Sequence, residues 1–293
     1  MPNDRSADAQ RLARGLNPYH AVTYFAPEAR EAFEDVGLRG FWRGYFAGRA
    51  APMGPVTAPV VTATFYGFAP HFVARAVPSV WDLASPADAL DARLAGVDAT
   101  MRRVLGDDVC ASAEMSRAAS LARALADACR DAARPLGASN RALSTPDEPH
   151  LGLWQATTVL REDRGDAHIA VLAFDDVGGC ESQVLMVGIG ALTREWIQAA
   201  RGWTDDEWVV AHDALVTRGL VAADGFATDE GRALRRAIED RTDDLAATVL
   251  EDAGEAGSPE RVEELLSLVE PFTQAIVDSE TVPFPNPVGL PKS

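Results

Sequence analysis

The stretch Leu151–Ala170 constrains the fold of this chain more than any other segment. Residues 151–160 have the spacing of a helix with an apolar face. That face is formed by Leu151, Leu153, Trp154, Thr157, Thr158 and Leu160. A dense polar cluster follows over residues 161–168, and an apolar run continues from His168 to Phe174. Charged groups between buried segments are unfavourable unless they are paired or used in binding. The pattern therefore predicts two buried segments that meet at a polar junction, which is the best candidate for a functional site.

Two interpretations of the polar junction stay open. In the first, Arg161 and Arg164 form ion pairs with the acids between them and join the two halves of the chain. In the second, the junction is a pocket at a domain boundary, where ligand sites often lie. There Arg161 or Arg164 would hold an anionic group. His168 would exchange protons, oriented by Asp166 or Glu162. The side chains expected to bind the ligand are Tyr24, Arg49, Tyr66, Arg161, Glu162, Arg164 and Asp166.

His20 is the second candidate for a catalytic residue, after His168. It lies in an apolar segment and shares a helix face with Tyr24, four residues later. It is either a hydrogen-bonded core histidine or a ligand contact. No HxH or HExxH spacing supports a metal site built from His20, His71 and His168, or a haem on His20, so we predict no metal. The sequence leaves the cofactor unknown.

The charge of the chain is strongly negative and unevenly distributed. The net charge is −17, yet residues 1–150 carry 17 acidic side chains against 16 arginines. Residues 203–270 carry 18 acidic side chains against 6 arginines. Because so acidic a surface repels phosphate backbones, we do not expect the C-terminal half to bind DNA.

Neither a membrane span nor a secretion signal is expected. No apolar run approaches the roughly 20 residues that cross a bilayer. The N-terminal residues 1–15 are polar and lack the apolar core of a signal peptide. These features predict a cytoplasmic protein without a membrane partner.

Helical patterns dominate the chain. The sequence predicts a helix over residues 6–15, a boundary at Pro18, and a long alanine-rich helix over 109–133. Ser85 and Thr204 each have the spacing of a helix N-cap. These signals predict a mainly α protein with a helical bundle over residues 1–145.

The segment 203–250 resembles the second half of a MarR-type winged helix. The resemblance is carried by Leu215–Val221, LVTRGLV, and by Ala227–Arg232, ATDEGR, on either side of a short hairpin. More widely, the segments PYHAVTYFAPE, GYFAGRAAP and LREDRGDAH are similar to actinobacterial proteins that form a helix-turn-helix family with no assigned activity. The resemblance implies a winged-helix-like domain over 150–272 with a short β-hairpin wing, followed by an extended proline-rich tail over 273–293.

The resemblance and the residues favour different functions. A winged helix implies a ligand-responsive transcriptional regulator, which would bind DNA through arginines of the N-terminal half, on a homodimer. However, the helix in the recognition position begins with Asp205-Asp-Glu207, and the wing tip is Asp224-Gly225, where DNA-binding proteins present Arg and Lys. The leading prediction is therefore a small-molecule-binding protein, or an enzyme of specialised metabolism, with a polar pocket at the domain junction. The regulator is the alternative.

Overall fold

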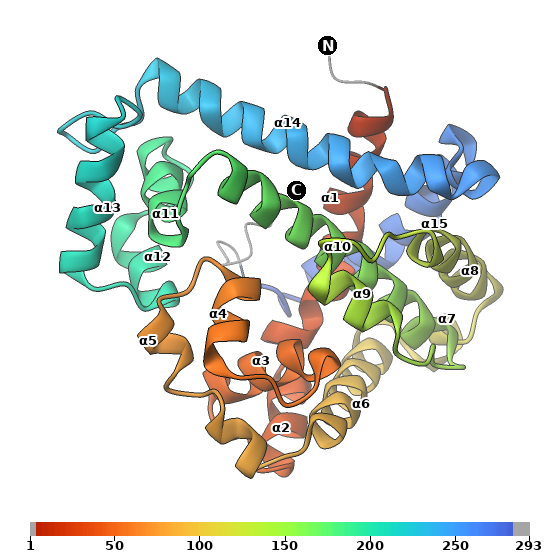
Figure 1. The fold of residues 1–293 in the computed structure, drawn as a ribbon. Coiled ribbons are helices and arrows are strands. Elements are labelled where there is room, and N and C mark those ends of the chain that lie inside the picture. Colours follow the sequence, from red (N-terminus) through yellow and green to blue (C-terminus); the bar gives the residue numbers. More distant parts are fainter. Residues whose placement is uncertain (1–3, 284–293) are drawn as a thin grey trace.

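A long central helix, α10 (Pro149–Phe174), organises the fold (Figure 1). The structure is a computed structural model that describes residues 4–283. Pro149 begins α10 at a position where proline is tolerated, and no further proline interrupts it. The polar residues 161–168 are therefore part of one continuous helix, whereas the sequence predicted a junction between two segments. Their side chains leave α10 in several directions and meet different neighbouring helices.

The chain before α10 forms helices of very different length. They are α1 (Asp4–Phe25), α2 (Pro27–Asp35), α3 (Phe41–Ala50), η1 (Ala51–Met53), α4 (Ala58–Phe65), α5 (Pro70–Val73), η2 (Ser79–Asp82), α6 (Pro86–Leu105), α7 (Asp107–Cys110), α8 (Ala113–Asp127) and α9 (Pro135–Arg141). Pro18 lies inside α1, so the helix boundary predicted there is wrong. The predicted helix over 109–133 is divided into α7 and α8. The predicted cap at Ser85 is confirmed, because its hydroxyl accepts a hydrogen bond from the amide of Asp88.

The chain after α10 forms a cluster of shorter helices and then two long ones. They are α11 (Gly179–Gly188), α12 (Arg194–Arg201), α13 (Asp205–Thr217), α14 (Asp229–Asp252), η3 (Gly254–Gly257) and α15 (Pro259–Asp278). Thr204 and Glu207 form the predicted capping box at the start of α13. Because α15 continues to Asp278, the prediction of an extended tail is wrong for residues 273–278. Residues 284–293 of that tail lie outside the described residues.

The predicted β-hairpin wing is wrong. Within residues 4–283 the structure has no β-strand, and a single antiparallel bridge joins Val221 to Ala227. The amide of Ala227 donates to the carbonyl of Gly188, at the end of α11, over 2.9 Å. Because the loop between α13 and α14 is short and its hydrogen bonds go partly to α11, no ladder of paired strands forms. The mainly α part of the prediction is confirmed.

The largest hydrophobic core contains residues from both ends of the chain. α1 packs against α10, α14 and α15, and α8 packs against α10 and α15. Tyr19, Trp154 and Ile276 are fully or almost fully buried there. A second, aromatic core joins α3 to α6 around Phe46 and Phe68, and a third lies within α11–α13. The division into domains at residues 145–150 and 272 stays a prediction.

The prediction that no segment spans a membrane can be compared with the length and hydropathy of the helices. None of the helices within residues 4–283 combines the length and the apolar character that a bilayer span requires.

Gly96 allows α2 and α6 to pack closely. A Cβ atom at Gly96 would lie 2.5 Å from the Cα of Ala29 and 3.2 Å from the carbonyl oxygen of Glu28. Both neighbours are backbone atoms, so neither can move without shifting α2. We therefore expect Gly96→Ala to lower the free energy of unfolding by about 1–3 kcal/mol, although alanine favours a helix. Urea denaturation measures this change.

Gly152→Ala in α10 is the matched control. A Cβ there meets its nearest neighbour, the carbonyl oxygen of Pro146, at an ordinary distance of 3.5 Å. We expect it to keep or raise stability by up to about 1 kcal/mol. Equal effects of the two substitutions would contradict the close packing at Gly96.

Candidate functional site

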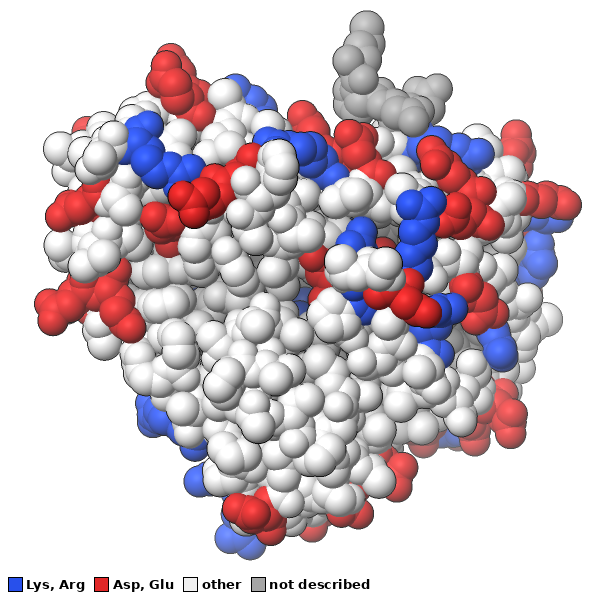
Figure 2. Space-filling view, in the orientation of Figure 1, with Lys and Arg blue, Asp and Glu red and all other residues white. Residues whose placement is uncertain are grey.

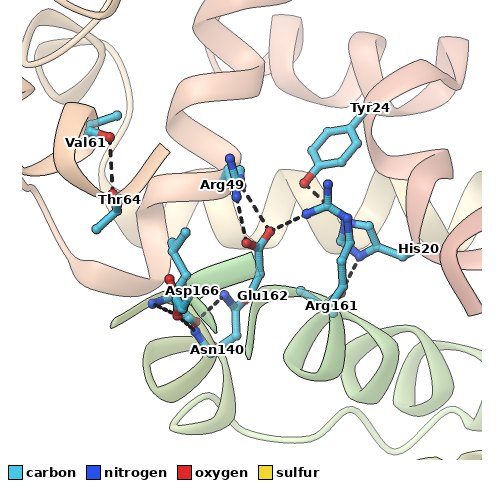
Figure 3. A network of polar contacts seen from close by, with 12 residues as sticks. His20, Tyr24, Arg49, Val61, Thr64, Asn140, Arg161, Glu162 and Asp166 are labelled. Carbon is cyan, nitrogen blue, oxygen red and sulfur yellow. Dashed lines mark hydrogen bonds and ion pairs between the residues drawn. The ribbon is translucent and has the colours of Figure 1, made fainter. Parts of the chain in front are cut away.

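A buried ion pair between α3 and α10 lies at the centre of the site (Figure 3). Arg49 donates to Glu162 twice, from Nε to Oε1 over 3.0 Å and from Nη2 to Oε2 over 2.8 Å. Arg161 donates to the same carboxylate, with 2.8 Å between Nη1 and Oε1. Only 1% of the Glu162 side chain is exposed, compared with 12% for Arg49 and 23% for Arg161. One carboxylate thus faces two guanidinium groups, and one positive charge is left in excess.

The two arginines keep Glu162 ionised. Burial alone would raise the pKa of Glu162, but the attraction of Arg49 and Arg161 outweighs burial and lowers it to about 2. Burial would lower the pKa of Arg49, but the carboxylate of Glu162 raises it well above its ordinary value. Both partners are therefore charged at neutral pH, inside the protein.

His20 and Tyr24 of α1 lie beside this ion pair. The Nδ1 atom of His20 lies 3.0 Å from the hydroxyl of Thr158, and its Nε2 atom lies 3.2 Å from the hydroxyl of Tyr24. The imidazole stacks on Trp154, with 5.9 Å between ring centroids. Burial, aided by Arg161, lowers the pKa of His20 well below its ordinary value. His20 is thus a neutral core histidine whose two ring nitrogens both have partners.

Asp166 contacts α9. Its Oδ2 atom accepts hydrogen bonds from the backbone amides of Leu136 and Gly137, each over 2.9 Å, and so caps the first turn of that helix. A Cβ atom on Gly137 would lie 2.9 Å from the Cα of Asp163, so glycine permits this approach of α9 to α10. Burial raises the pKa of Asp166 to about 7. The role of Asp166 in the structure is to hold α9 against α10.

Arg164 and His168 contact α14. The Nη2 atom of Arg164 lies 2.7 Å from Oδ1 of Asp243 and 3.1 Å from Oε2 of Glu239. The Nδ1 atom of His168 lies 3.0 Å from the hydroxyl of Thr242. Burial lowers the pKa of His168 to about 4, so its imidazole is neutral at pH 7. Of the ion pairs that the sequence suggested within the cluster, Arg161 makes one with Glu162, whereas Arg164 pairs with Asp243 and Glu239 of α14 instead.

A cavity of about 290 Å³ also lies against this part of α10. We call it the arginine cavity. Its basic side chains are Arg49, Arg161, His168, Arg201 and Arg235. Its aromatic side chains are Tyr45, Phe65, Tyr66 and Phe68. Ile169, Leu172, Leu185, Met186, Leu192, Ile197 and Ile238 make up the aliphatic part, and Gly67, Gly165, Ser182 and Gln183 complete the lining. Figure 2 shows a hollow in this part of the surface, between α10 and α4.

The lining of the arginine cavity carries positive charge. No Asp or Glu within residues 4–283 lines it. The guanidinium carbon of Arg201 lies 4.5 Å from the ring centroid of Phe68. Burial lowers the pKa of Arg201, and repulsion from Arg49 and Arg161 lowers it further, while Tyr45 opposes this shift. The guanidinium groups of Arg49, Arg161 and Arg201 therefore repel one another at this cavity.

A second cavity, also of about 290 Å³, lies between α1, α8, α10 and α14. We call it the aliphatic cavity. Its apolar lining is Ala9, Leu12, Ala13, Leu16, Leu125, Leu160, Ala246, Val249 and Leu250. Its polar lining is Asn17, Arg49, Thr157, Arg161, Asp163, Arg164 and His168, together with Gly165. Arg49, Arg161, Gly165 and His168 are therefore shared with the arginine cavity.

The structure separates the residues expected at the site into three groups. Arg49, Arg161, His168 and Tyr66 line the arginine cavity, and the Tyr66 hydroxyl donates to the carbonyl of Val177 over 2.8 Å. Tyr24, Glu162 and His20 lie in the core next to that cavity. Arg164 lines the aliphatic cavity but not the arginine cavity, and Asp166 lines neither of them.

Sequence reasoning missed Tyr45, Arg201 and Arg235. Tyr45 lies four residues before Arg49 on the same helix face, and this spacing could have revealed it. Arg235 lies four residues before Glu239 and pairs with it, which is again a helical spacing. Arg201 is the last residue of α12, and no local pattern connects it to α10.

The exposed face of α13 is acidic and apolar. Asp205, Asp206, Val209, Val210 and Asp213 are exposed on it. Figure 2 shows acidic side chains at the left edge of the molecule, where Figure 1 places this helix. Within residues 4–283, no group of three or more His, Cys, Asp or Glu side chains is arranged to hold a metal ion.

Glu162→Gln tests the central ion pair. The substitution leaves Arg49 and Arg161 without a carboxylate, so we expect the free energy of unfolding to fall by about 3 kcal/mol. Urea denaturation at pH 7 measures the loss. Glu264→Gln is the surface control, because Glu264 pairs with Arg117 and Arg261 at the surface, where it is 33% exposed compared with 1% for Glu162, and a smaller change is expected there. Equal losses in both variants would contradict a special role for Glu162.

Comparison with known proteins identifies the family of the chain. The sequence matches the model of a family described as a helix-turn-helix family over residues 9–283. No curated protein and no solved structure gives a significant match. The likeness to MarR-type proteins and the actinobacterial origin stay predictions. Because the match spans both the helices that line the arginine cavity and α11–α13, the chain as a whole belongs to this helix-turn-helix family.

Proposed function

We propose that this protein binds a small organic anion in the arginine cavity. The observation that carries the proposal is the composition of the cavity lining, which contains four arginines and, within the described part of the chain, no acidic residue. In a chain with a net charge of −17, this local excess of positive charge runs against the overall composition. Charge that a protein concentrates in a cavity against its general trend is typical of a site for the opposite charge.

The electrostatics support an anion rather than a neutral ligand. Glu162 pairs with both Arg49 and Arg161, and Glu239 pairs with Arg235 of this cavity and with Arg164. Arg201 adds a further charge, with a guanidinium group stacked on Phe68. A carboxylate or phosphate would therefore reduce the repulsion among Arg49, Arg161 and Arg201, and guanidinium groups bind such anions with two parallel hydrogen bonds.

The apolar part of the lining supports an organic ligand. Phe65 and Phe68 lie on one side of the arginine cavity, and Leu185 and Ile197 of α11 and α12 are buried on another. Ligand sites in proteins are mostly apolar, with a few polar groups that fix the orientation of the ligand. A volume of about 290 Å³ is at the lower end of the usual range of such sites, about 300–1,000 Å³.

Ligands of equal length and opposite charge test the proposal. We expect sodium octanoate to raise the melting temperature of the protein and octylammonium chloride not to, because a ligand that binds the folded state stabilises it. At about 100 times the dissociation constant, octanoate should stabilise the protein by about 2.7 kcal/mol. Differential scanning fluorimetry and calorimetric titration measure the two effects. An equal response to both compounds would contradict a charge-selective cavity.

Two arginine variants locate the binding. Arg201→Met should weaken octanoate binding about tenfold or more, because it removes a charge-assisted contact of about 1.5–3 kcal/mol. Arg123→Met on α8 is the control, since Arg123 is exposed, pairs with Asp127 and lines neither cavity. Equal affinity in both variants would mean that octanoate binds elsewhere.

A ligand-responsive DNA-binding regulator is the second candidate, and membership of a helix-turn-helix family supports it. The acidic face of α13 argues against DNA contact through that helix. We expect the fluorescence anisotropy of labelled DNA to show no salt-sensitive binding to the protein when measurements at about 50 and about 200 mM salt are compared. Asp205→Asn with Asp206→Asn gives the sharper test. If α13 contacts DNA, this double variant binds it more tightly, and the regulator then becomes the better candidate.

A further inference from the structure

The two cavities share a stripe of residues on one face of α10. Arg161, Gly165 and His168 line both of them, and Arg49 from α3 is the fourth shared residue. The three residues of α10 are separated by four and three positions, so they lie on one face of the helix. The arginine cavity lies on the α11–α12 side of this stripe, and the aliphatic cavity lies on the α1–α8 side.

Gly165 occupies the middle of the shared stripe and leaves it open. A Cβ atom built on Gly165 would meet one side-chain atom, Oε2 of Glu162, at 3.8 Å, which is an ordinary contact distance. Glycine is unfavourable inside a helix by roughly 1 kcal/mol compared with alanine. Its φ is helical, and no neighbour is close enough to exclude a small side chain. At this position, which lines both cavities, α10 therefore carries no side chain, although a small one would have room.

The two cavities differ in the chemistry of their outer walls. The arginine cavity has aromatic rings beside its basic groups. The walls that α1, α8 and α14 give to the aliphatic cavity contain Leu12, Leu16, Leu125, Val249 and Leu250, and no aromatic side chain. An unbranched alkyl chain fits such a wall, whereas the arginines fit an anionic head group.

We infer that a single elongated ligand, an alkyl carboxylate, spans both cavities across Gly165. Its carboxylate lies among Arg49, Arg161 and Arg201, and its alkyl chain passes over Gly165 into the aliphatic cavity. This inference rests on the proposed function, since it requires an anion in the arginine cavity. It adds the class of the ligand and the route of its chain through the protein.

A series of carboxylates of increasing length tests the inference. We expect calorimetric titration of the full chain with octanoate, decanoate and dodecanoate to show a gain in affinity of roughly fourfold per added methylene, as for burial of alkyl groups. Octanoate that binds without any gain for longer chains would overturn the inference and leave the proposed function in place. If none of the three carboxylates binds, both the inference and the proposed function fail.

Variants on either side of Gly165 show where the chain lies. Gly165→Leu places a branched side chain in the middle of the shared stripe of α10. Ala246→Phe fills the aliphatic cavity from α14. Each should lose the gain on lengthening to dodecanoate. Ala246→Phe, whose position does not line the arginine cavity, should also bind octanoate within about threefold of the wild type. Gly165→Ala is the matched control and should keep the gain, because a methyl group has room there. If Gly165→Leu and Ala246→Phe, both folded as judged by circular dichroism, keep the full gain, the ligand does not cross Gly165.

Discussion

The attraction between one buried carboxylate and two arginines is the interaction on which the centre of this protein depends. Glu162 is almost fully enclosed, and an ionised carboxylate in that position is unfavourable without charged partners. Arg49 supplies two parallel hydrogen bonds from α3, and Arg161 supplies a third from α10 itself. The pair therefore fixes the position of α3 on α10. It also leaves the positive charge that distinguishes the neighbouring cavity from the rest of the molecule.

Helix geometry explains how α10 contacts several neighbouring helices. Residues four apart share a face, whereas adjacent residues point in directions about 100° apart. Asp163 accordingly faces α9 and Arg134, while Arg164, the next residue, faces Asp243 of α14. Arg161, Gly165 and His168 form a third face, which lines both cavities, and His168 also reaches Thr242 of α14. The density of charge over residues 161–168 thus reflects several separate contacts made by successive residues of one helix.

This geometry decides how much the sequence could reveal. The mainly α class followed from periodicity and from capping residues such as Ser85 and Thr204, because these are local signals. The sequence also indicated that charged side chains within residues 161–168 lie among buried segments, and Glu162, Asp163 and Asp166 are indeed buried. The break expected there was wrong, because a polar cluster does not end a helix that lacks proline and is packed on several sides. The packing of α1 against α14 and α15 joins segments more than 200 residues apart, and no local pattern carries that information.

The members of the site were predictable only in part, for the same reason. Arg49 and Tyr66 were among the side chains expected to bind a ligand, and the structure places both in the lining of the arginine cavity. Arg201 was not expected, because it enters the cavity through the packing of α12 against the aromatic core. His20 was a catalytic candidate because of its residue type, but both of its ring nitrogens have hydrogen-bond partners, and one of these partners comes from α10. A single sequence shows which residues are unusual, whereas the fold determines which of them meet.

A strongly acidic protein can hold an anion because the two charge distributions act over different distances. The acidic side chains are mainly on the surface, where salt screens their repulsion within about 8 Å at physiological ionic strength. The side chains of Arg49, Arg161 and Arg201 are partly withdrawn from solvent, and screening there is weaker. An approaching anion therefore meets little long-range repulsion and a strong short-range attraction. The same argument underlies our expectation that DNA binds poorly, since most of its phosphates would remain beside the acidic surface rather than in the cavity.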